Sequence, residues 1–124
     1  MPSRIVAVIG ASSDRRKFGN RALRAFAEQG DTVIPINPNE REVEGRPAYA
    51  SVLDVPGAID MATFYVPPPI GERVIEDVAK KGIPEVWLNP GAESDALIAR
   101  AEALGIRPIV ACSIMAIGRD PYTL

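Results

Sequence analysis

Five short apolar runs alternate with amphipathic segments along the whole chain, and this alternation restricts the folds that it can adopt. The first run, Ile5–Ile9, is apolar at every position, which is typical of a strand buried on both faces of a parallel sheet. The other runs occupy residues 32–36, 60–66, 84–88 and 107–111. Right-handed crossovers turn such an alternation into an open parallel sheet with helices on both faces.

Three helices with one apolar face are predicted between the runs. Each ends at a glycine suited to a left-handed cap, namely Gly30, Gly82 and Gly105. A polar loop is expected over residues 38–50, followed by a short helical turn over 51–55 with Ser51 as its N-cap. The chain from Cys112 onward is expected to be irregular.

The predicted fold is a single α/β domain over residues 1–124, a Rossmann-like three-layer sandwich around a five-stranded parallel sheet. Its 124 residues suit one domain. Numbered by appearance, the strands are predicted in the order 3-2-1-4-5, with the reversal between strands one and four.

Composition narrows the function. The net charge of -2 gives no general attraction to nucleic acid or anionic membranes. The single cysteine, Cys112, cannot form an internal disulfide, which fits a reducing compartment. With no membrane-spanning run and no signal-peptide pattern, we expect a soluble cytoplasmic protein, monomeric or homodimeric.

The chain contains no histidine. The commonest general base of enzymes near neutral pH is therefore missing, and with one cysteine a soft-ligand zinc site is nearly excluded as well. These absences favour binding over catalysis.

The residues that follow the strands should meet at one rim, where open α/β sheets bind ligands. Gly10-Ala11-Ser12-Ser13 follows the first strand and leads into a helix whose N–H groups favour an anion. Arg15, Arg16 and Lys17 add positive charge there. We interpret this loop as a phosphate site, the alternative being a solvated basic helix face.

The loop is not the NAD fingerprint. A G-x-G-x-x-G pattern from Gly10 would need glycine where Ser12 and Arg15 stand. The second strand ends in Asn37-Pro38 instead of the acidic residue that binds ribose hydroxyls. Arg41 could instead meet a phosphate on the ribose, as in NADP or coenzyme A.

Three further features lie at this rim. The prolines of Pro67-Pro68-Pro69 could form a rigid wall for adenine or pantetheine, or only a stiff connection into the next helix. Asn89-Pro90-Gly91 could contact a ligand or form a plain turn. Cys112 could form a mixed disulfide with coenzyme A, or be a buried inert thiol.

Four motifs in order, residues 6–12, Ile36-Asn37-Pro38, residues 65–69 and residues 86–91, resemble the stand-alone coenzyme A-binding domain family. That family is similar to the N-terminal domain of the succinyl-CoA synthetase alpha subunit. The resemblance extends to about Cys112. The catalytic phosphohistidine of the synthetase lies outside the matching region, so ligase activity does not carry over.

The resemblance implies a set of coenzyme A-binding residues at the rim. It places the phosphates on the first loop, the nucleotide beside the end of the second strand, and the adenine and pantetheine along the end of the third strand. The end of the fourth strand would contact the ligand mainly through its backbone. The implied set is Gly10, Ala11, Ser12, Ser13, Arg16, Lys17, Asn37, Pro38, Arg41, Tyr65, Val66, Pro67, Ile70, Asn89 and Pro90.

The leading hypothesis is a non-catalytic protein that binds coenzyme A or an acyl-CoA and senses, carries or presents it to another protein. The alternative is an enzyme or redox sensor that uses NADP or another dinucleotide. A third possibility is an interaction subunit that has kept the fold and lost the ligand, because fold does not fix function.

Overall fold

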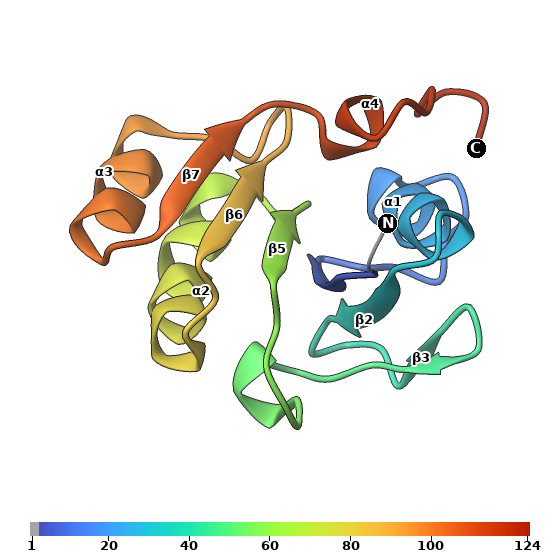
Figure 1. Cartoon of the computed structure of the whole chain (residues 1–124), viewed down its shortest axis with the longest axis horizontal. Coiled ribbons are helices and arrows are strands. Elements are labelled where there is room, and N and C mark those ends of the chain that lie inside the picture. Colours follow the sequence, from blue (N-terminus) through green and yellow to red (C-terminus); the bar gives the residue numbers. More distant parts are fainter. Residues whose placement is uncertain (1–2) are drawn as a thin grey trace.

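The computed structural model describes residues 3–124 as an α/β fold around a five-stranded sheet (Figure 1). Every pairing in this sheet is parallel. Its strands are β1 Ile5–Ile9, β2 Thr32–Ile36, β5 Met61–Phe64, β6 Glu85–Leu88 and β7 Arg107–Val110. The predicted fold class is therefore confirmed.

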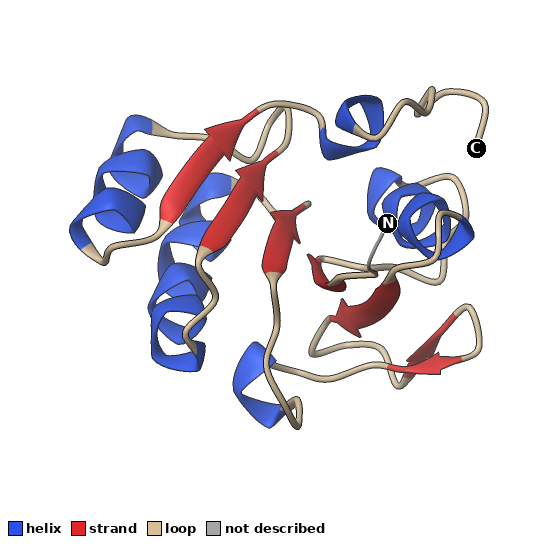
Figure 2. Cartoon of the chain, in the orientation of Figure 1, coloured by secondary structure: helices blue, strands red, loops and turns tan. Residues whose placement is uncertain are grey.

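Helices lie on both sides of the sheet (Figure 2). On one side, α2 packs against both α3 and the short 3-10 helix η1, and on the other α1 packs against α4. The helices are α1 Phe18–Glu28, η1 Val52–Asp54, α2 Pro68–Lys81, α3 Asp95–Ala103 and α4 Ser113–Ala116.

The alternation of side chains along β1 divides the core between the two sides. Ala7 and Ile9 belong to the cluster that contains Ile75 of α2, whereas Val6 and Val8 belong to the cluster that contains Phe26 of α1. Because successive strand residues point to opposite faces, an apolar run without polar interruptions fits a strand covered on both sides.

The predicted helix ends and the predicted cap at Ser51 are confirmed by the structure. Gly30, Gly82 and Gly105 follow α1, α2 and α3 with positive φ angles of 102°, 81° and 78°. Ser51 begins η1 by accepting a hydrogen bond from the Leu53 amide, and Ser94 begins α3 in the same way with the Leu97 amide.

The structure corrects the predicted strand order. The sheet runs β2-β1-β5-β6-β7, so by appearance the order is 2-1-3-4-5 and the reversal lies between the first and third strands. The right-handed crossover rule permits either direction after β2. Here Val52, Val55 and Ile59 of the β2–β5 connection bury on the α2 side, which carries β5 past β1.

Two irregular regions of the sequence also contain structure. The polar loop over 38–50 includes an antiparallel hairpin of β3 Glu42–Val43 and β4 Arg46–Pro47. The segment after Cys112, expected to be irregular, includes α4, whose Ile114 is fully buried near α1. Burial of this one apolar side chain orders a turn too short to show periodicity.

Across residues 3–124, none of the helices has the length and apolar character that crossing a membrane requires.

Candidate ligand-binding site

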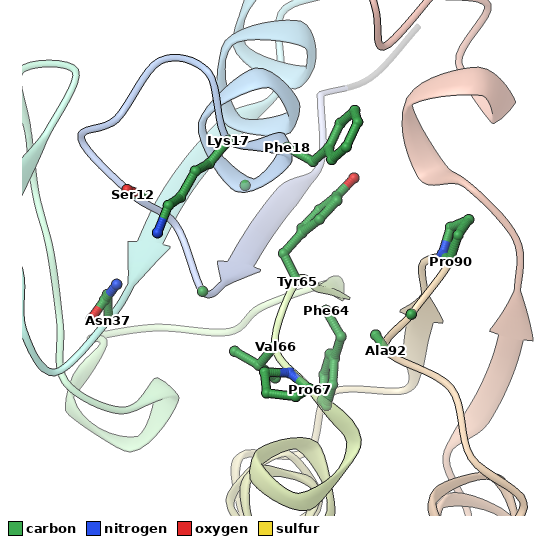
Figure 3. A pocket seen from close by; sticks show the side chains of 13 residues that line it. Ser12, Lys17, Phe18, Asn37, Phe64, Tyr65, Val66, Pro67, Pro90 and Ala92 are labelled. Atoms are coloured by element: carbon green, nitrogen blue, oxygen red, sulfur yellow. The ribbon is translucent and has the colours of Figure 1, made fainter.

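An open cleft of about 390 Å³ lies at the carboxyl ends of the strands, beside the reversal in strand order (Figure 3). Residues from the ends of β1, β2, β5 and β6 and from the start of α1 line it. They are Gly10, Ser12, Lys17, Phe18, Gly19, Asn37, Phe64, Tyr65, Val66, Pro67, Pro90, Gly91 and Ala92.

Two glycines allow the first loop to pack closely at the base of the cleft. Gly10 has a φ of +86°, and a Cβ there would lie 2.5 Å from the Tyr65 carbonyl oxygen. A Cβ on Gly19, in the first turn of α1, would lie 2.5 Å from the Gly10 carbonyl oxygen. Both neighbours are backbone atoms, so the turn requires glycine at both positions.

The start of α1 forms the polar end of the cleft. Lys17 is its N-cap residue, and among the residues described no side chain caps this helix and no acidic residue lies in its first turn. The N-terminal amide groups and the positive end of the helix dipole are therefore left for an anion. The Lys17 side chain extends into the cleft between Ser12 and Asn37 (Figure 3).

Lys17 lines the cleft and its neighbour Arg16 does not, a difference that the sequence pattern did not indicate. The Arg16 guanidinium donates two hydrogen bonds of 3.0 Å to the Asp14 carboxylate, and its side chain is 88% exposed, outside the cleft lining. The hydrogen bond from Arg16 lowers the pKa of Asp14 to about 2. The Arg15 Nε atom lies 3.6 Å from the Glu44 Oε2 atom, so Arg15 is also paired with an acidic side chain.

The end of β2 contributes one predicted residue and leaves two outside. The Asn37 side chain lines the cleft while its amide donates to the Ala11 carbonyl oxygen at 2.8 Å. Pro38 and Arg41 are exposed and lie outside the lining. The structure therefore does not bring Arg41 to the cleft.

Tyr65, Val66 and Pro67 form an apolar wall opposite the polar end (Figure 3). The Tyr65 hydroxyl lies 3.1 Å from the Ser113 hydroxyl. Burial raises the pKa of Tyr65 to about 12, against a smaller opposing effect of its hydrogen bonds. Ile70, also predicted at the site, lies in the first turn of α2, exposed and outside the lining.

The Asn89 side chain points into the protein, not toward a ligand. It is 2% exposed, and its amide donates to the Thr63 hydroxyl at 2.7 Å and the Phe64 carbonyl oxygen at 2.8 Å. Its carbonyl oxygen accepts from the Ser113 backbone amide at 2.9 Å. Pro90, the next residue, lines the cleft.

Two further predicted residues stand apart from the cleft, and five residues outside the implied set line it. Ala11 is fully buried in the core, and the Ser13 amide donates to Glu40. The lining residues outside the implied set are Phe18, Gly19, Phe64, Gly91 and Ala92, of which Gly91 belongs to the Asn89-Pro90-Gly91 turn already considered as a ligand contact. Gly19 carried a signal, because glycine is unfavourable in a helix unless close packing requires it.

The fold and the cleft define a Rossmann-like α/β domain with an open cleft at the reversal of strand order, where folds of this kind bind ligands. A model of the CoA binding domain matches residues 4–118, and the chain belongs to that family.

CoA ligases include a segment that resembles this chain. The alpha subunit of acetate–CoA ligase (ADP-forming) II from Pyrococcus furiosus is 39% identical over 79 residues, which are 63% of this chain and 17% of that subunit. This chain thus spans less than a fifth of the length of the ligase relatives that it matches first.

Solved structures that resemble this chain include one matched over nearly its whole length and one matched over a quarter of its length. A conserved hypothetical protein from Pyrococcus furiosus superimposes with a TM-score of 0.84 at 32% identity, covering 93% of this chain and 99% of that one. The dinucleotide-forming acetyl-coenzyme A synthetase 1 of Candidatus Korarchaeum cryptofilum gives a TM-score of 0.77 at 33% identity, covering 87% of this chain and 25% of that one.

Proposed function

We propose that this protein binds coenzyme A or an acyl-CoA in the cleft and acts as a non-catalytic module that senses, carries or presents it. Membership of the CoA binding domain family supports the ligand class. The name of the Pyrococcus furiosus relative, a CoA ligase subunit, points to the same ligand. The hypothetical protein matched over 99% of its length supports a domain that exists without the rest of a ligase.

The observation that carries the proposal is the pairing of an anion-ready helix start with an apolar wall in one cleft. The pyrophosphate would lie on Gly10 and Ser12, at the N-terminus of α1, with Lys17 beside it. The less polar parts of the ligand would follow Tyr65, Val66 and Pro67. A ligand with phosphates at one point and a long uncharged arm matches both surfaces.

The lining residues also support a non-catalytic role. The ionisable side chains among them are those of Lys17 and Tyr65. With a pKa of about 12, Tyr65 remains protonated at neutral pH and cannot serve as a general base there. Lys17, at the exposed mouth, is placed to hold an anion.

Calorimetric titration with coenzyme A at low and high salt tests whether the phosphates lie beside Lys17. The structure suggests a matched pair of variants, because Lys17 lines the cleft and Arg16 does not. Lys17→Ala should weaken binding by about tenfold, the usual effect of losing a charge-assisted contact, and should flatten the salt dependence. Arg16→Ala removes the same charge from an adjacent residue outside the cleft and should leave the affinity within about twofold.

Equal losses in the two variants, or none in Lys17→Ala, would refute the phosphate assignment. Native mass spectrometry of the purified protein supplies an independent readout, since a retained ligand with the mass of coenzyme A or a thioester is expected. Tight binding of NADPH without binding of coenzyme A would reverse the proposal in favour of a dinucleotide enzyme. Absence of any nucleotide binding would favour an interaction subunit.

A further inference from the structure

A second, smaller cavity of about 150 Å³ adjoins the cleft. The two share Phe18, Tyr65 and Pro90 as a common border. The cavity extends from this border beneath the C-terminal segment, where Cys112, Met115 and Tyr122 line it. It therefore opens from the apolar side of the cleft, away from the Lys17 side chain.

The C-terminal segment forms the roof of this cavity and is held by contacts with α1. The rings of Phe18 and Tyr122 meet edge to face with centroids 5.8 Å apart. The Arg21 guanidinium lies 5.2 Å from the centroid of the Phe18 ring and donates to the Pro121 carbonyl oxygen at 2.8 Å. These contacts hold the roof over the cavity although Tyr122 is itself 78% exposed.

The hydroxyl of Tyr65 and the side-chain amide of Asn89, which line the cavity, are already hydrogen-bonded within the protein. The Ser113 hydroxyl forms hydrogen bonds with the Thr63 hydroxyl at 2.8 Å and with the Tyr65 hydroxyl at 3.1 Å. Asn89 is fully engaged beside them. An uncharged hydrocarbon group can therefore lie against Tyr65 and Asn89 without leaving their hydroxyl and amide groups unpaired.

We propose that this cavity receives the acyl group of a coenzyme A thioester, so that the protein distinguishes acyl-CoAs by acyl length. The inference rests on the proposed function, because the orientation of the ligand follows from phosphates held at Lys17. With that end fixed, the pantetheine arm runs along the apolar wall to the border formed by Phe18, Tyr65 and Pro90. The thioester then lies at the mouth of the cavity.

The size of the cavity sets the acyl length. An apolar protein cavity of about 150 Å³ accommodates a molecule the size of benzene. The cavity therefore suits an unbranched acyl group of about four to six carbons, whereas a long fatty acyl chain would have to displace the roof.

An affinity series with coenzyme A, acetyl-CoA, butyryl-CoA, hexanoyl-CoA and palmitoyl-CoA tests this inference. Two additional buried methylenes should make butyryl-CoA bind about tenfold more tightly than acetyl-CoA. Affinity should be highest at four to six carbons and fall for palmitoyl-CoA. Equal affinity for all thioesters would overturn the inference.

Two variants locate the effect. Cys112→Leu fills the cavity and should remove the preference for butyryl-CoA over acetyl-CoA. Ala116→Leu adds the same side chain to an exposed position of α4 outside the cavity and should keep the preference. Loss of the preference in both variants, or in neither, would place the acyl group elsewhere.

The wild-type protein offers a test that requires no variant to fold. Cys112 is the single cysteine of the chain, so its alkylation by iodoacetamide can be followed by intact-protein mass spectrometry. At equal saturation, butyryl-CoA should slow alkylation at least fivefold more than acetyl-CoA does. Equal rates would refute occupancy of the cavity.

The outcomes separate the two proposals. If coenzyme A and its thioesters all fail to bind, the proposed function fails and this inference fails with it. If coenzyme A binds and the acyl series is flat, the proposed function stands and this inference alone is refuted.

Discussion

Gly19 shows how one residue can set the shape of the cleft. It lies in the first turn of α1, where the Gly10 carbonyl oxygen occupies the space that a side chain would need. Because Gly19 has no side chain, the start of α1 packs directly against the first loop, close to the place where an anion would bind. Because the Gly10 carbonyl oxygen is a backbone atom, it cannot move away from a side chain at position 19 unless the backbone of the first loop moves as well.

We predict that Gly19→Ala destabilises the protein, although alanine favours a helix by about 1 kcal/mol over glycine. The 2.5 Å approach to the Gly10 carbonyl oxygen should outweigh that gain and give a net loss of roughly 2 kcal/mol. Urea unfolding followed by circular dichroism measures it.

Gly71 is the matched control, because it is also a buried glycine within a helix. A Cβ there would meet the Leu97 Cδ2 atom at 3.0 Å, the end of a side chain that can adjust. Gly71→Ala should therefore cost at least 1 kcal/mol less than Gly19→Ala. A larger loss in Gly71→Ala would contradict this account of the loop.

We predict that Tyr65 makes the free energy of unfolding decrease at alkaline pH. Burial raises its pKa from 10.0 to about 12 in the folded protein, so the unfolded chain loses this proton first. The resulting stability is present below pH 10 and is lost as the pH rises to about 12. The loss should be on the order of 2 kcal/mol.

The measurement compares unfolding free energies between pH 9 and pH 12 in the wild type and in Tyr65→Phe, whose decline should be smaller. Tyr122→Phe changes an exposed ring and should retain the wild-type decline. An identical decline in Tyr65→Phe would assign the alkaline sensitivity to other groups.

At the scale of elements, the helices α1 and α3 begin differently. Ser94 caps α3 by accepting from the Leu97 amide at 3.0 Å. The helix α1 has Lys17 at the same position, with extended φ and ψ angles of −79° and 146° that suit a capping residue. Lys17 nevertheless provides no side-chain cap, so the start of α1 at the cleft is left uncapped.

We predict that Lys17→Ser raises stability and weakens ligand binding at once. A serine hydroxyl at this position can accept from the first turn and should add about 1 kcal/mol to the unfolding free energy. The same change removes the cation from the cleft and should weaken coenzyme A binding by about tenfold.

Thermal unfolding and calorimetry on the same preparation check both effects. Ser94→Ala provides the opposite control, since it removes a cap away from the cleft. It should lower stability by about 1 kcal/mol without a change in affinity. Lower stability in Lys17→Ser would mean that Lys17 holds the helix start in a way that its cap geometry does not reveal.

Across the whole molecule, Asn89 links parts that are distant in sequence. Its buried amide joins the end of β6 to the end of β5 through Phe64, and to the start of α4 through Ser113. The same side chain therefore holds two strand ends at the cleft and the segment that roofs the second cavity. Its engagement explains why it is buried at a rim where ligand contacts were expected.

We predict that Asn89→Ala destabilises the protein by about 3 kcal/mol, because it leaves buried groups of Thr63, Phe64 and Ser113 unpaired. Hydrogen exchange should rise most over residues 113–124. Asn37→Ala removes a more exposed amide at the same rim and should cost about 1 kcal/mol. Unchanged exchange over 113–124 would show that α4 is held independently.

Local chemistry in the sequence determined most of the elements of this fold and the edge at which the site lies. Apolar runs, serine caps and glycine stops act over a few residues, so the bounds of β2 and the ends of α2 and α3 could be read directly. In a parallel sheet the carboxyl ends of the strands share one edge, which fixed the rim without further information.

Tertiary packing decided the strand order and the detailed composition of the site. Both directions after β2 obey the crossover rule, and the burial of Val52 and Val55 chose between them. Arg16 and Lys17 are neighbours of equal charge, and the position of Asp14 turned one of them away. The roof over the second cavity depends on contacts of Arg21 and Phe18 with residues about a hundred positions away, which no local pattern records.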